Sequence, residues 1–567
     1  MSKDTILSQR YSRIIILISL LTIISGYIAN NLLWGLRSPI YFYRDSLMNI
    51  QWAVHYGKFF RNERLVYNPD LVQVLQEKNI QRDTNLYYRE EYNETLKGPI
   101  SGKKKITLQD LLKFHHPPLW FIYLGSFFAI FGFQSWAIFI AQAILGGITI
   151  WLTYILGKKV CSVPVGVVSA FMLSTLPSFL SLTRQGFLEA MVLPVLLLAI
   201  IYIDYILKYP SKRIYYLIFS SVCIIGILAK SIFFLYVLLL IVIAIIFSDK
   251  KYLRRSIYNF SVSIGTIILA SLLWQLYNHE KLSFYYNMAI DKGMAQTLFN
   301  PGNIINMLLV LKNVQLENVL FILFILAVVI FYIKGRPANI SYVVFFLIFG
   351  YVIIIFMPFA VIVRHFSPFL PLVIIVTCSV LMSFKYVRLH TIVFLLVFSL
   401  VRGYGWLIPN FPLLDQKLYF YDDIGTKRVK HSYSIYARDV EPHSFSAFAP
   451  LGPLRQRAIY GAIKKISSFS GVRVVRIIGP GKYAFEKKFL GGALSLYSIY
   501  ENYPLIVEGP YREQYTPFED RIWIILRDSE KDVDFSKGTL RDSSRLKYIT
   551  GVLLSAKVMC DIFKENL

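Results

Sequence analysis

The sequence predicts a polytopic α-helical membrane protein with about 11–13 transmembrane helices and a C-terminal soluble α/β domain. Of its 567 residues, 56% are hydrophobic and only 17% are charged, whereas soluble domains have about 25% charged residues. Apolar runs of helical length recur along most of the chain, with short basic clusters between them. This composition excludes an ordinary soluble enzyme, a disordered chain and a disulfide-rich secreted module.

The positive charge follows the membrane pattern and does not call for a nucleic acid. Lys and Arg number 60 against 34 Asp and Glu, for a formal net charge of +26. Most of this charge lies in short clusters between apolar runs, as the positive-inside rule and sites for anionic ligands would produce. The four cysteines lie far apart and predict neither a metal site nor a disulfide framework.

The first apolar run, 14–33, follows three basic residues and precedes no small-residue cleavage site. We interpret it as a spanning helix with a cytoplasmic N-terminus rather than a signal peptide. A polar stretch at about 36–115 then forms an outer loop. Within it, Asp45–Phe60 has helical apolar spacing that predicts a helix at the membrane surface, with Gly57 as its C-terminal end.

Further apolar runs predict the remaining membrane helices. They lie at about 116–133, 136–156, 163–182, 187–207, 214–229, 231–248, 256–276, 315–333, 340–360, 366–384 and 391–409. Basic clusters between them include Lys158/Lys159, Lys208/Lys212/Arg213, Lys250/Lys251/Arg254/Arg255, Lys334/Arg336 and Lys385/Arg388. A cytoplasmic location of these clusters places residues 183–188, 277–303, 361–365 and all that follow 410 on the outer side.

The number of crossings before residue 158 is left open. The loop that contains Asp45 and the cluster at Lys158 must lie on opposite sides, which requires an odd number of crossings between them. Either one of the runs 116–133 and 136–156 does not cross the membrane, or a polar-looking stretch before residue 115 does.

The sequence divides into a transmembrane domain, 1–409, and an extracytoplasmic α/β domain, 410–567. In the second, Leu454–Ser467 has the pattern of an amphipathic helix. Its predicted strands are rich in β-branched and aromatic residues, at Val472–Ile478, Pro504–Val507 and Arg521–Leu526.

Two carboxylates are candidates for chemistry at the outer boundary. Glu189 is the one carboxylate between Asp110 and Asp204, and ionisable residues at membrane depth usually face a cavity or a partner. It could instead be a first-turn Glu favoured by the helix dipole, or a partner of Arg184. Asp45 follows Arg44 just after the first span, where it suits both an N-cap and a general base.

Basic residues on the outer side are candidates for phosphate binding. Lys230 and the Arg364-His365 pair lie there against the positive-inside trend. A snorkelling lysine, or an ion pair to Glu189 or Asp45, is the alternative. His115 and His116 could bind a metal or a phosphate, or could be ordinary interfacial histidines.

The order of these features resembles the membrane glycosyltransferases of the GT-C fold. The likeness is to the protein O-mannosyltransferase superfamily and the bacterial aminoarabinose transferases that modify lipid A. It covers about residues 14–400, and the shared order of the motifs, rather than any single one, carries it. The matched segments are Asp45, His116-Pro117-Pro118-Leu119, Thr183-Arg184 through Glu189, Ala229-Lys230-Ser231 and Arg364-His365-Phe366-Ser367-Pro368.

The sequence departs from this family at three places. Asp45-Ser46 stands where many members have two adjacent acids, the Lys230 turn lacks the usual glycine, and His365 replaces a tyrosine. These departures affect the prediction of the donor sugar and of the phosphate-binding residues more than the prediction of the glycosyltransferase class.

The resemblance implies transfer of a sugar from a polyprenyl-phosphate carrier to an acceptor hydroxyl on the extracytoplasmic side, with inversion. Lys230, Arg364 and His365 would bind the donor phosphate, Asp45 would act as the base and Glu189 would position the acceptor or the sugar. Further candidates are Arg44, His115, His116 and Arg184.

The partners expected are the polyprenyl-phosphate-linked sugar, a lipid, glycan or protein acceptor and the lipid bilayer, with no nucleic acid. The sequence establishes no cofactor and leaves a divalent metal open, and the expected location is the bacterial plasma (inner) membrane. The alternatives are a transporter or flippase of lipid-linked sugars, a lipid-linked oligosaccharide ligase that uses a diphosphate donor, and a non-catalytic scaffold.

Overall fold

A computed structural model describes most of the helical part of the chain and selected strands beyond it. The described residues are 3–37, 44–65, 104–105, 107–112, 116–133, 135–184, 186–279, 282–283, 304, 308–309, 311–312, 316–333, 338–355, 363–383, 388–404, 417–424, 427–434, 474–478, 506–508, 521–528, 546–555 and 558–565. The chain divides into two compact units. The first contains Met1–Leu33, Phe114–Trp120 and Phe139–Tyr436, and the second Trp34–Lys113, Phe121–Ile138 and Ala437–Leu567.

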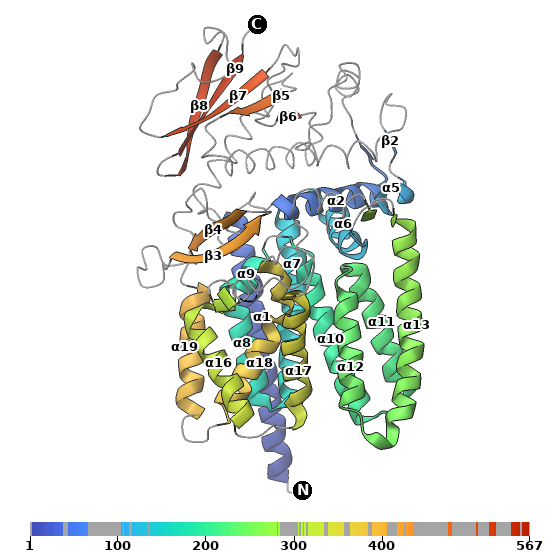
Figure 1. Cartoon of the computed structure of the whole chain (residues 1–567). Helices are drawn as coiled ribbons and strands as arrows, with labels where there is room; N and C mark the ends of the chain where they lie inside the picture. The colour runs from blue at the N-terminus through green and yellow to red at the C-terminus, as the bar shows by residue number, and fades with distance from the viewer. Residues whose placement is uncertain are drawn as a thin grey trace. The chain divides into compact units, whose positions relative to one another are not determined.

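The first unit is a bundle of helices that run side by side (Figure 1). Its elements are α1 (Lys3–Arg37), α7 (Ser135–Val160), α8 (Val163–Thr175), α9 (Pro177–Leu182), α10 (Glu189–Lys208), α11 (Arg213–Ala229), α12 (Phe233–Ile246), η2 (Lys250–Tyr252), α13 (Leu253–Tyr277), α16 (Glu317–Ile333), α17 (Ala338–Ile355), η4 (Val363–Phe369), α18 (Leu370–Leu381) and α19 (Arg388–Tyr404). Each predicted apolar run from 136 onward coincides with one or two of these helices. The unit ends in an antiparallel hairpin of β3 (Lys417–Ile424) and β4 (Lys427–Ser434).

Helix length and composition support membrane insertion. Four segments of the described chain are long and apolar enough to cross a membrane: Ile14–Leu33, Trp136–Val160, Glu189–Lys208 and Lys250–Tyr277. Shorter apolar helices of 10–17 residues accompany them. On α13, Leu269, Leu272, Leu273 and Leu276 are exposed at 44–67%. A lipid environment accounts for such a leucine face, which water would not favour.

The helix before α7 corresponds to the run 116–133, one of the two runs whose membrane crossing the sequence leaves open. This helix, α6 (Leu119–Phe131), has 13 residues, whereas a membrane span needs about 20. The bundle helices α8 and α12 have 13 and 14 residues, so α6 is no shorter than other predicted spans. Both alternatives for the crossing before residue 158 therefore stand. The total number of spans stays a prediction.

The second unit places α2 (Arg44–Phe60) against α5 (Leu108–Leu112) and α6. From α2, the Trp52 indole and the Tyr56 hydroxyl both donate hydrogen bonds to the Leu111 carbonyl oxygen, at 3.3 and 3.0 Å. The Tyr56 ring also stacks on Phe121 of α6, with ring centroids 6.2 Å apart. A short antiparallel pair, β1 (Arg64–Leu65) with β2 (Lys104–Lys105), lies in the same unit.

The prediction that Gly57 ends this helix is wrong, because α2 continues to Phe60. Gly57 serves a close helix contact instead. A Cβ atom on Gly57 would lie 2.8 Å from Phe128 Cβ, and one on Gly125 of α6 would lie 2.5 Å from Tyr56 Cβ. The chain turns after the helix at Asn62, whose φ of 55° is a left-handed conformation that Asn tolerates.

The C-terminal residues of the second unit contain a five-stranded sheet with strand order β6-β5-β7-β9-β8. β5 (Val474–Ile478) is parallel to β6 (Ile506–Glu508) and β7 (Arg521–Asp528), whereas β9 (Val558–Glu565) is antiparallel to β7 and to β8 (Leu546–Ser555). The three predicted strands are confirmed as β5, β6 and β7. The predicted helix Leu454–Ser467 and the connections between these strands lie outside the described residues, so the α/β domain and its boundary at 410 stay predictions.

We expect acid to destabilise the second unit through His55 of α2. The His55 side chain is buried, and this burial, together with the charge of Lys58, lowers its pKa to about 3. The unfolded chain takes up a proton below pH 6.5, whereas the folded chain does not. The unfolding free energy should therefore decrease by up to about 1.4 kcal/mol per pH unit as the pH falls from 6.5 towards 3.

The measurement is thermal melting of wild type and His55→Gln at pH 7.5 and pH 5. The wild type should lose more stability than the variant over this interval. An equal loss in both proteins would assign the acid sensitivity to other groups.

Candidate active site

Glu189 and Lys230 form a buried ion pair at one end of α10. Glu189 is the first residue of α10, and Lys230 follows the last residue of α11. The Lys230 ammonium donates to Glu189 Oε1, with side chains only 13% and 3% exposed, respectively. A carboxylate at a helix N-terminus and a cation at a helix C-terminus each complement the helix dipole. The structure therefore joins two of the predicted site residues directly, in the ion pair that the sequence offers as the alternative to phosphate binding at Lys230, and Glu189 occupies the first helical turn of the other alternative.

The turn that leads into α10 is tied to α1 by uncharged polar side chains. The Arg184 guanidinium donates to Asn31 Oδ1 from Nε at 2.9 Å and to Asn30 Oδ1 from Nη2 at 3.2 Å. Arg184 is 8% exposed, so these acceptors replace water for a charge that would be costly to bury alone. Gly186, at φ 70°, allows the chain to reverse before Glu189.

A second link between α1 and this turn passes through Tyr27. Its hydroxyl donates to Thr183 Oγ1 at 2.7 Å, in a fully buried contact. The ring has room because position 146 of α7 is a glycine: a Cβ atom there would lie 1.9 Å from the Tyr27 hydroxyl oxygen. Side chains of α1 thus fix the position of the Thr183-Arg184 turn, and α7 packs against one of them, Tyr27.

The segment η4 packs against α9, α10 and α17. Phe369 anchors it, with its ring centroid 5.5 Å from that of Tyr236 and 5.0 Å from that of Tyr351. Gly350 makes space for this ring, since a Cβ atom there would lie 2.4 Å from Phe369 Cε1. The predicted phosphate ligands Arg364 and His365 lie in η4, and their side chains are outside the described residues.

The other predicted site residues lie elsewhere in the chain. Arg44 and Asp45 are the first two residues of α2, in the second unit. The helix begins at Arg44, so Asp45 lies in the first turn instead of at the N-cap. Both side chains, and all of His115, lie outside the described residues, whereas His116 is half-buried in the loop before α6.

Three buried hydroxyl groups near Glu189 and η4 lack protein partners among the described residues. They belong to Tyr236, Tyr351 and Ser367. Tyr236 is close enough to Glu189 for the carboxylate to act electrostatically on its hydroxyl. Buried hydroxyls are normally hydrogen-bonded, so a bound ligand or ordered water would satisfy them. As for metals, no group of three or more His, Cys, Asp or Glu side chains converges within the described ranges.

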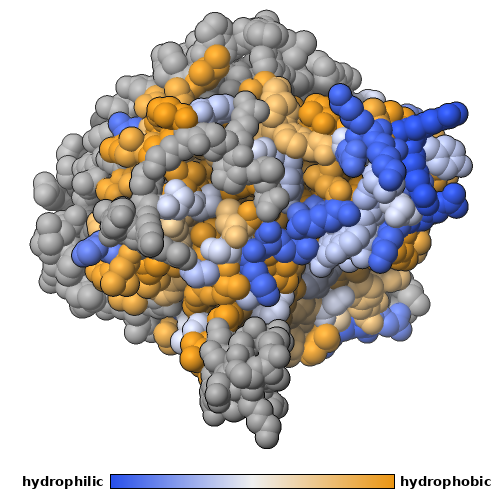
Figure 2. Space-filling model, turned by 90° about the horizontal axis from the view of Figure 1, so that it is seen from below, coloured by the Kyte–Doolittle hydropathy of each residue, from blue (hydrophilic) through white to orange (hydrophobic). Residues whose placement is uncertain are grey.

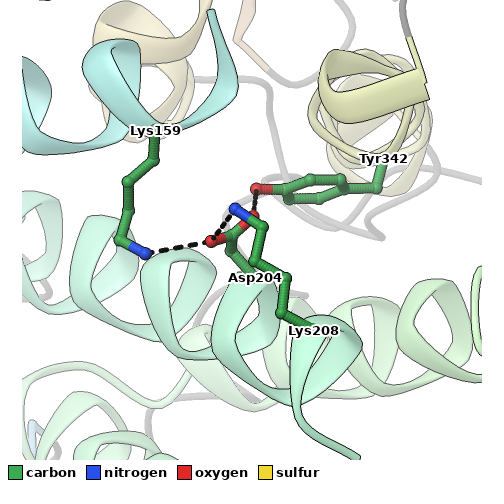
Figure 3. Close-up of polar contacts among 4 residues, drawn as sticks. All are labelled: Lys159, Asp204, Lys208 and Tyr342. Carbon is green, nitrogen blue, oxygen red and sulfur yellow. Dashed lines mark hydrogen bonds and ion pairs between the residues drawn. The ribbon is translucent and has the colours of Figure 1, made fainter.

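The opposite end of α10 carries a second buried carboxylate, Asp204 (Figure 3). Asp204 Oδ2 accepts hydrogen bonds from Lys159 of α7 at 3.0 Å and from Lys208 at 2.9 Å. The hydroxyl of Tyr342, on α17, lies 3.3 Å from Asp204 Oδ1. This cluster fastens α10 to α7 and α17, far along the helix from Glu189.

The sequence reasoning missed several of these groups. Asn30 and Asn31 are adjacent amides inside the first apolar run, and that placement is a signal for a buried polar partner. The Asp204 carboxylate inside an apolar run carries the same signal. Tyr236 and Tyr351 have no sequence signal, because tyrosine is common in apolar helices that pack in a bundle, whereas Ser367 belongs to the segment Arg364-His365-Phe366-Ser367-Pro368 that carries the resemblance.

One family model matches part of the chain, and one solved structure resembles its fold at a TM-score above 0.5. Residues 115–274 match the family model described as dolichyl-phosphate-mannose-protein mannosyltransferase. The crystal structure of ArnT from Cupriavidus metallidurans bound to undecaprenyl phosphate is similar over 97% of this chain and 97% of that one, at 10% identity and a TM-score of 0.55. The apo state of that protein covers 89% and 95%, at 11% identity and a TM-score of 0.47.

The Archaeoglobus fulgidus oligosaccharyltransferase is a more distant match, over 79% of this chain and 61% of that one, at 13% identity and a TM-score of 0.35. No curated protein sequence matches the chain. The resemblance to GT-C fold glycosyltransferases, which the motif order indicates, is confirmed at the level of the fold.

We expect Gly146→Ala to destabilise the protein and Gly147→Ala to leave it nearly unchanged. At position 146 the added Cβ collides with the Tyr27 hydroxyl at 1.9 Å, whereas at position 147 its nearest neighbour is Ile24 Cγ2 at 3.4 Å. Overpacking of this kind costs about 1–3 kcal/mol. Thermal melting of the two variants tests this, and equal melting temperatures would mean that Tyr27 does not occupy this position.

Neutralising the Glu189–Lys230 pair one residue at a time should cost more than neutralising both. Glu189→Gln or Lys230→Met leaves one buried charge without its partner, at a cost of about 3–5 kcal/mol. The double variant removes both charges and should recover most of the lost stability. The measurement is a double-mutant cycle on unfolding, and additive losses would contradict direct pairing.

Proposed function

We propose that this protein is an integral membrane glycosyltransferase that moves a sugar from a polyprenyl-phosphate donor to an acceptor hydroxyl on the extracytoplasmic side. The observation that carries the proposal is the buried Glu189–Lys230 pair, with Arg184 in the preceding turn, at one end of a long apolar helix. Such charges are expensive at membrane depth and usually serve an ionic or polar substrate. The match to a protein with bound undecaprenyl phosphate supports a lipid phosphate as that substrate.

In the proposed reaction, the acceptor oxygen attacks the anomeric carbon of the sugar. The bond from that carbon to the phosphate oxygen breaks, and the electron pair leaves with the lipid phosphate. The acceptor proton passes to the Asp45 carboxylate, which acts as general base. A single displacement of this kind inverts the anomeric configuration.

The leaving phosphate gains negative charge and requires cations in a dry environment. Lys230 is suited to this role because its side chain is the more exposed of the pair, at 13% against 3% for Glu189. Arg364 and His365 would add positive charge from η4, which packs against α10. Glu189 would orient the sugar or the acceptor through hydrogen bonds to hydroxyl groups.

The further candidates have supporting places in this proposal. Arg184 would fix the turn before Glu189, and Arg44 would lie beside the base. His115 and His116 would contribute to a phosphate site or to a divalent metal site. The hydroxyls of Tyr236, Tyr351 and Ser367 would bind polar groups of the sugar, which offers the partners that these groups lack among the described residues.

A transporter or flippase of lipid-linked sugars, and an oligosaccharide ligase with a diphosphate donor, are the competing functions. Transporter sites usually lie near the midplane, where helices are broken. Here Glu189 and Lys230 lie at helix ends, which favours chemistry at one membrane boundary. The identity of the consumed donor separates the transferase from the ligase.

The test is glycosyl transfer by the full-length protein in reconstituted vesicles. A panel of polyprenyl-monophosphate and polyprenyl-diphosphate sugars is supplied with an envelope extract as acceptor. We expect release of the monophosphate carrier by wild type, with a loss of at least about 100-fold in Asp45→Asn and Lys230→Ala, because a general base and charge stabilisation each contribute 10²-fold or more. Lys158→Gln is the matched control, because Lys158 is an exposed lysine at the other end of the bundle.

The Glu189→Gln/Lys230→Met double variant separates stability from function. It should melt near the wild-type temperature yet release no carrier. Movement of labelled lipid without carrier release would favour the transporter, and consumption of the diphosphate donor alone would favour the ligase. Equal activity in all variants would show that the assigned residues are not the site. The same assay with a metal chelator tests whether carrier release requires a divalent metal.

A further inference from the structure

Five exposed cationic side chains gather at the end of the bundle where α10 meets α11 and α12 meets α13. They are Lys212, Arg213, Lys250, Lys251 and Arg254, and together they form what is called here the basic surface. All five lie in or beside two short connections, 209–212 and 247–252. Figure 2, which views the molecule from below, shows a hydrophilic area on the side of α11–α13, next to apolar helix faces.

The two connections are fixed to each other, so their charges cannot move apart freely. Arg255 of α13 donates to the Ser211 carbonyl oxygen at 2.8 Å. The Tyr216 hydroxyl lies 3.1 Å from Ser256 Oγ, and Ser248 Oγ lies 3.2 Å from the same atom. These contacts link α11, α13 and the connection before α13. The basic surface is therefore a preformed arrangement instead of a pair of independent loops.

Nearby carboxylates do not neutralise the basic surface. Asp249 is the one acid within the two connections, and its Oδ1 accepts from the backbone N–H of Lys251 at 3.0 Å. Asp204 is buried and already accepts from two lysines. No ion pair joins any of the five side chains to a carboxylate within the described part of the chain. Like charges on connections that are fixed to each other repel one another and favour a bound anion.

The depth of the basic surface matches the headgroup layer of a bilayer. It lies at the end of α10, whose 20 residues are apolar enough to cross a membrane. Tyrosines flank it, with Tyr215 stacked on Tyr205 at 5.2 Å between ring centroids and 6.0 Å from Tyr209. Lys212 lies 5.3 Å from the centroid of the Tyr209 ring. Tyrosine is enriched at this level because its ring is apolar and its hydroxyl is polar.

We propose that the basic surface binds the phosphate headgroups of anionic phospholipids on the side of the membrane opposite Glu189. Lysine ammonium groups attract phosphate as point charges, and arginine can bind it with two parallel hydrogen bonds. Orientation by the positive-inside rule requires only a charge excess, such as the two basic residues Lys334 and Arg336 in another connection. The basic surface has five cations that pair with no carboxylate among the described residues, on two connections that hydrogen bonds join. This is more positive charge than orientation requires. This inference does not depend on the proposed reaction.

The test uses the full-length protein in detergent, titrated with phosphatidylglycerol or phosphatidylcholine and examined by native mass spectrometry. The neutral variant carries Lys212→Gln, Arg213→Gln, Lys250→Gln, Lys251→Gln and Arg254→Gln. The matched control keeps every charge, with Lys212→Arg, Arg213→Lys, Lys250→Arg, Lys251→Arg and Arg254→Lys. Melting in phosphatidylcholine checks that all proteins are equally folded, as expected for exposed positions.

We expect wild type and the charge-keeping control to prefer phosphatidylglycerol, and the neutral variant to bind it on the order of tenfold or more weakly. High salt should abolish the preference. Equal binding of both lipids by wild type, or an unchanged preference in the neutral variant, would overturn the proposal. Displacement of the lipid by millimolar glycerol 1-phosphate would also overturn it, because it would indicate a site for a soluble phosphate.

Discussion

The first unit depends on the cost of burying charge in an apolar helix bundle. α10 carries a carboxylate near each end, Glu189 and Asp204, and both are buried at 2–3% exposure. An unpaired carboxylate in this environment would cost several kcal/mol, so each one needs a cation at a fixed position. Lys230 meets this need at one end, and Lys159 with Lys208 meets it at the other. The pairs therefore fix α10 against α7 and the connection between α11 and α12.

Close packing of uncharged aromatic side chains against glycines also holds the helices in place. Tyr27 reaches Thr183 only because Gly146 leaves space for its ring, and Phe369 reaches α12 only because Gly350 leaves space on α17. Because these two glycines have no side chain, the two rings pack closely against the helices. The packed rings fix the Thr183-Arg184 turn and η4 relative to α10. The polar groups proposed to act on a substrate thus lie on segments that packing holds in place, which is what precise orientation of reactants requires.

The locations of the helices can be predicted from the sequence, because the length of an apolar run and the basic clusters between runs are local signals. They predict the apolar helices between 136 and 404, while the content of β-branched and aromatic residues predicts the strands β5, β6 and β7. The error at Gly57 arose because a glycine that ends a helix and one that lies under a neighbouring helix look alike until the neighbour, here Gly125, is known. The same limit applies to the site. Motif order indicated Glu189 and Lys230, whereas Asn30, Asn31 and Tyr27 gain their roles only through contacts more than 150 residues away.

The ion pair also constrains how the proposed reaction can proceed. If the Lys230 ammonium turns towards a lipid phosphate, Glu189 loses the cation that makes its burial tolerable. Hydrogen bonds to the carboxylate would offset this loss, and the hydroxyls of a sugar or an acceptor are the donors that the proposed substrates bring. Binding of phosphate at Lys230 and binding of hydroxyl groups at Glu189 would therefore be energetically coupled, each lowering the cost of the other. The hydroxyl groups of a bound sugar would offset this loss at Glu189, so the same pair that stabilises the resting bundle would favour the loaded carrier over the spent one.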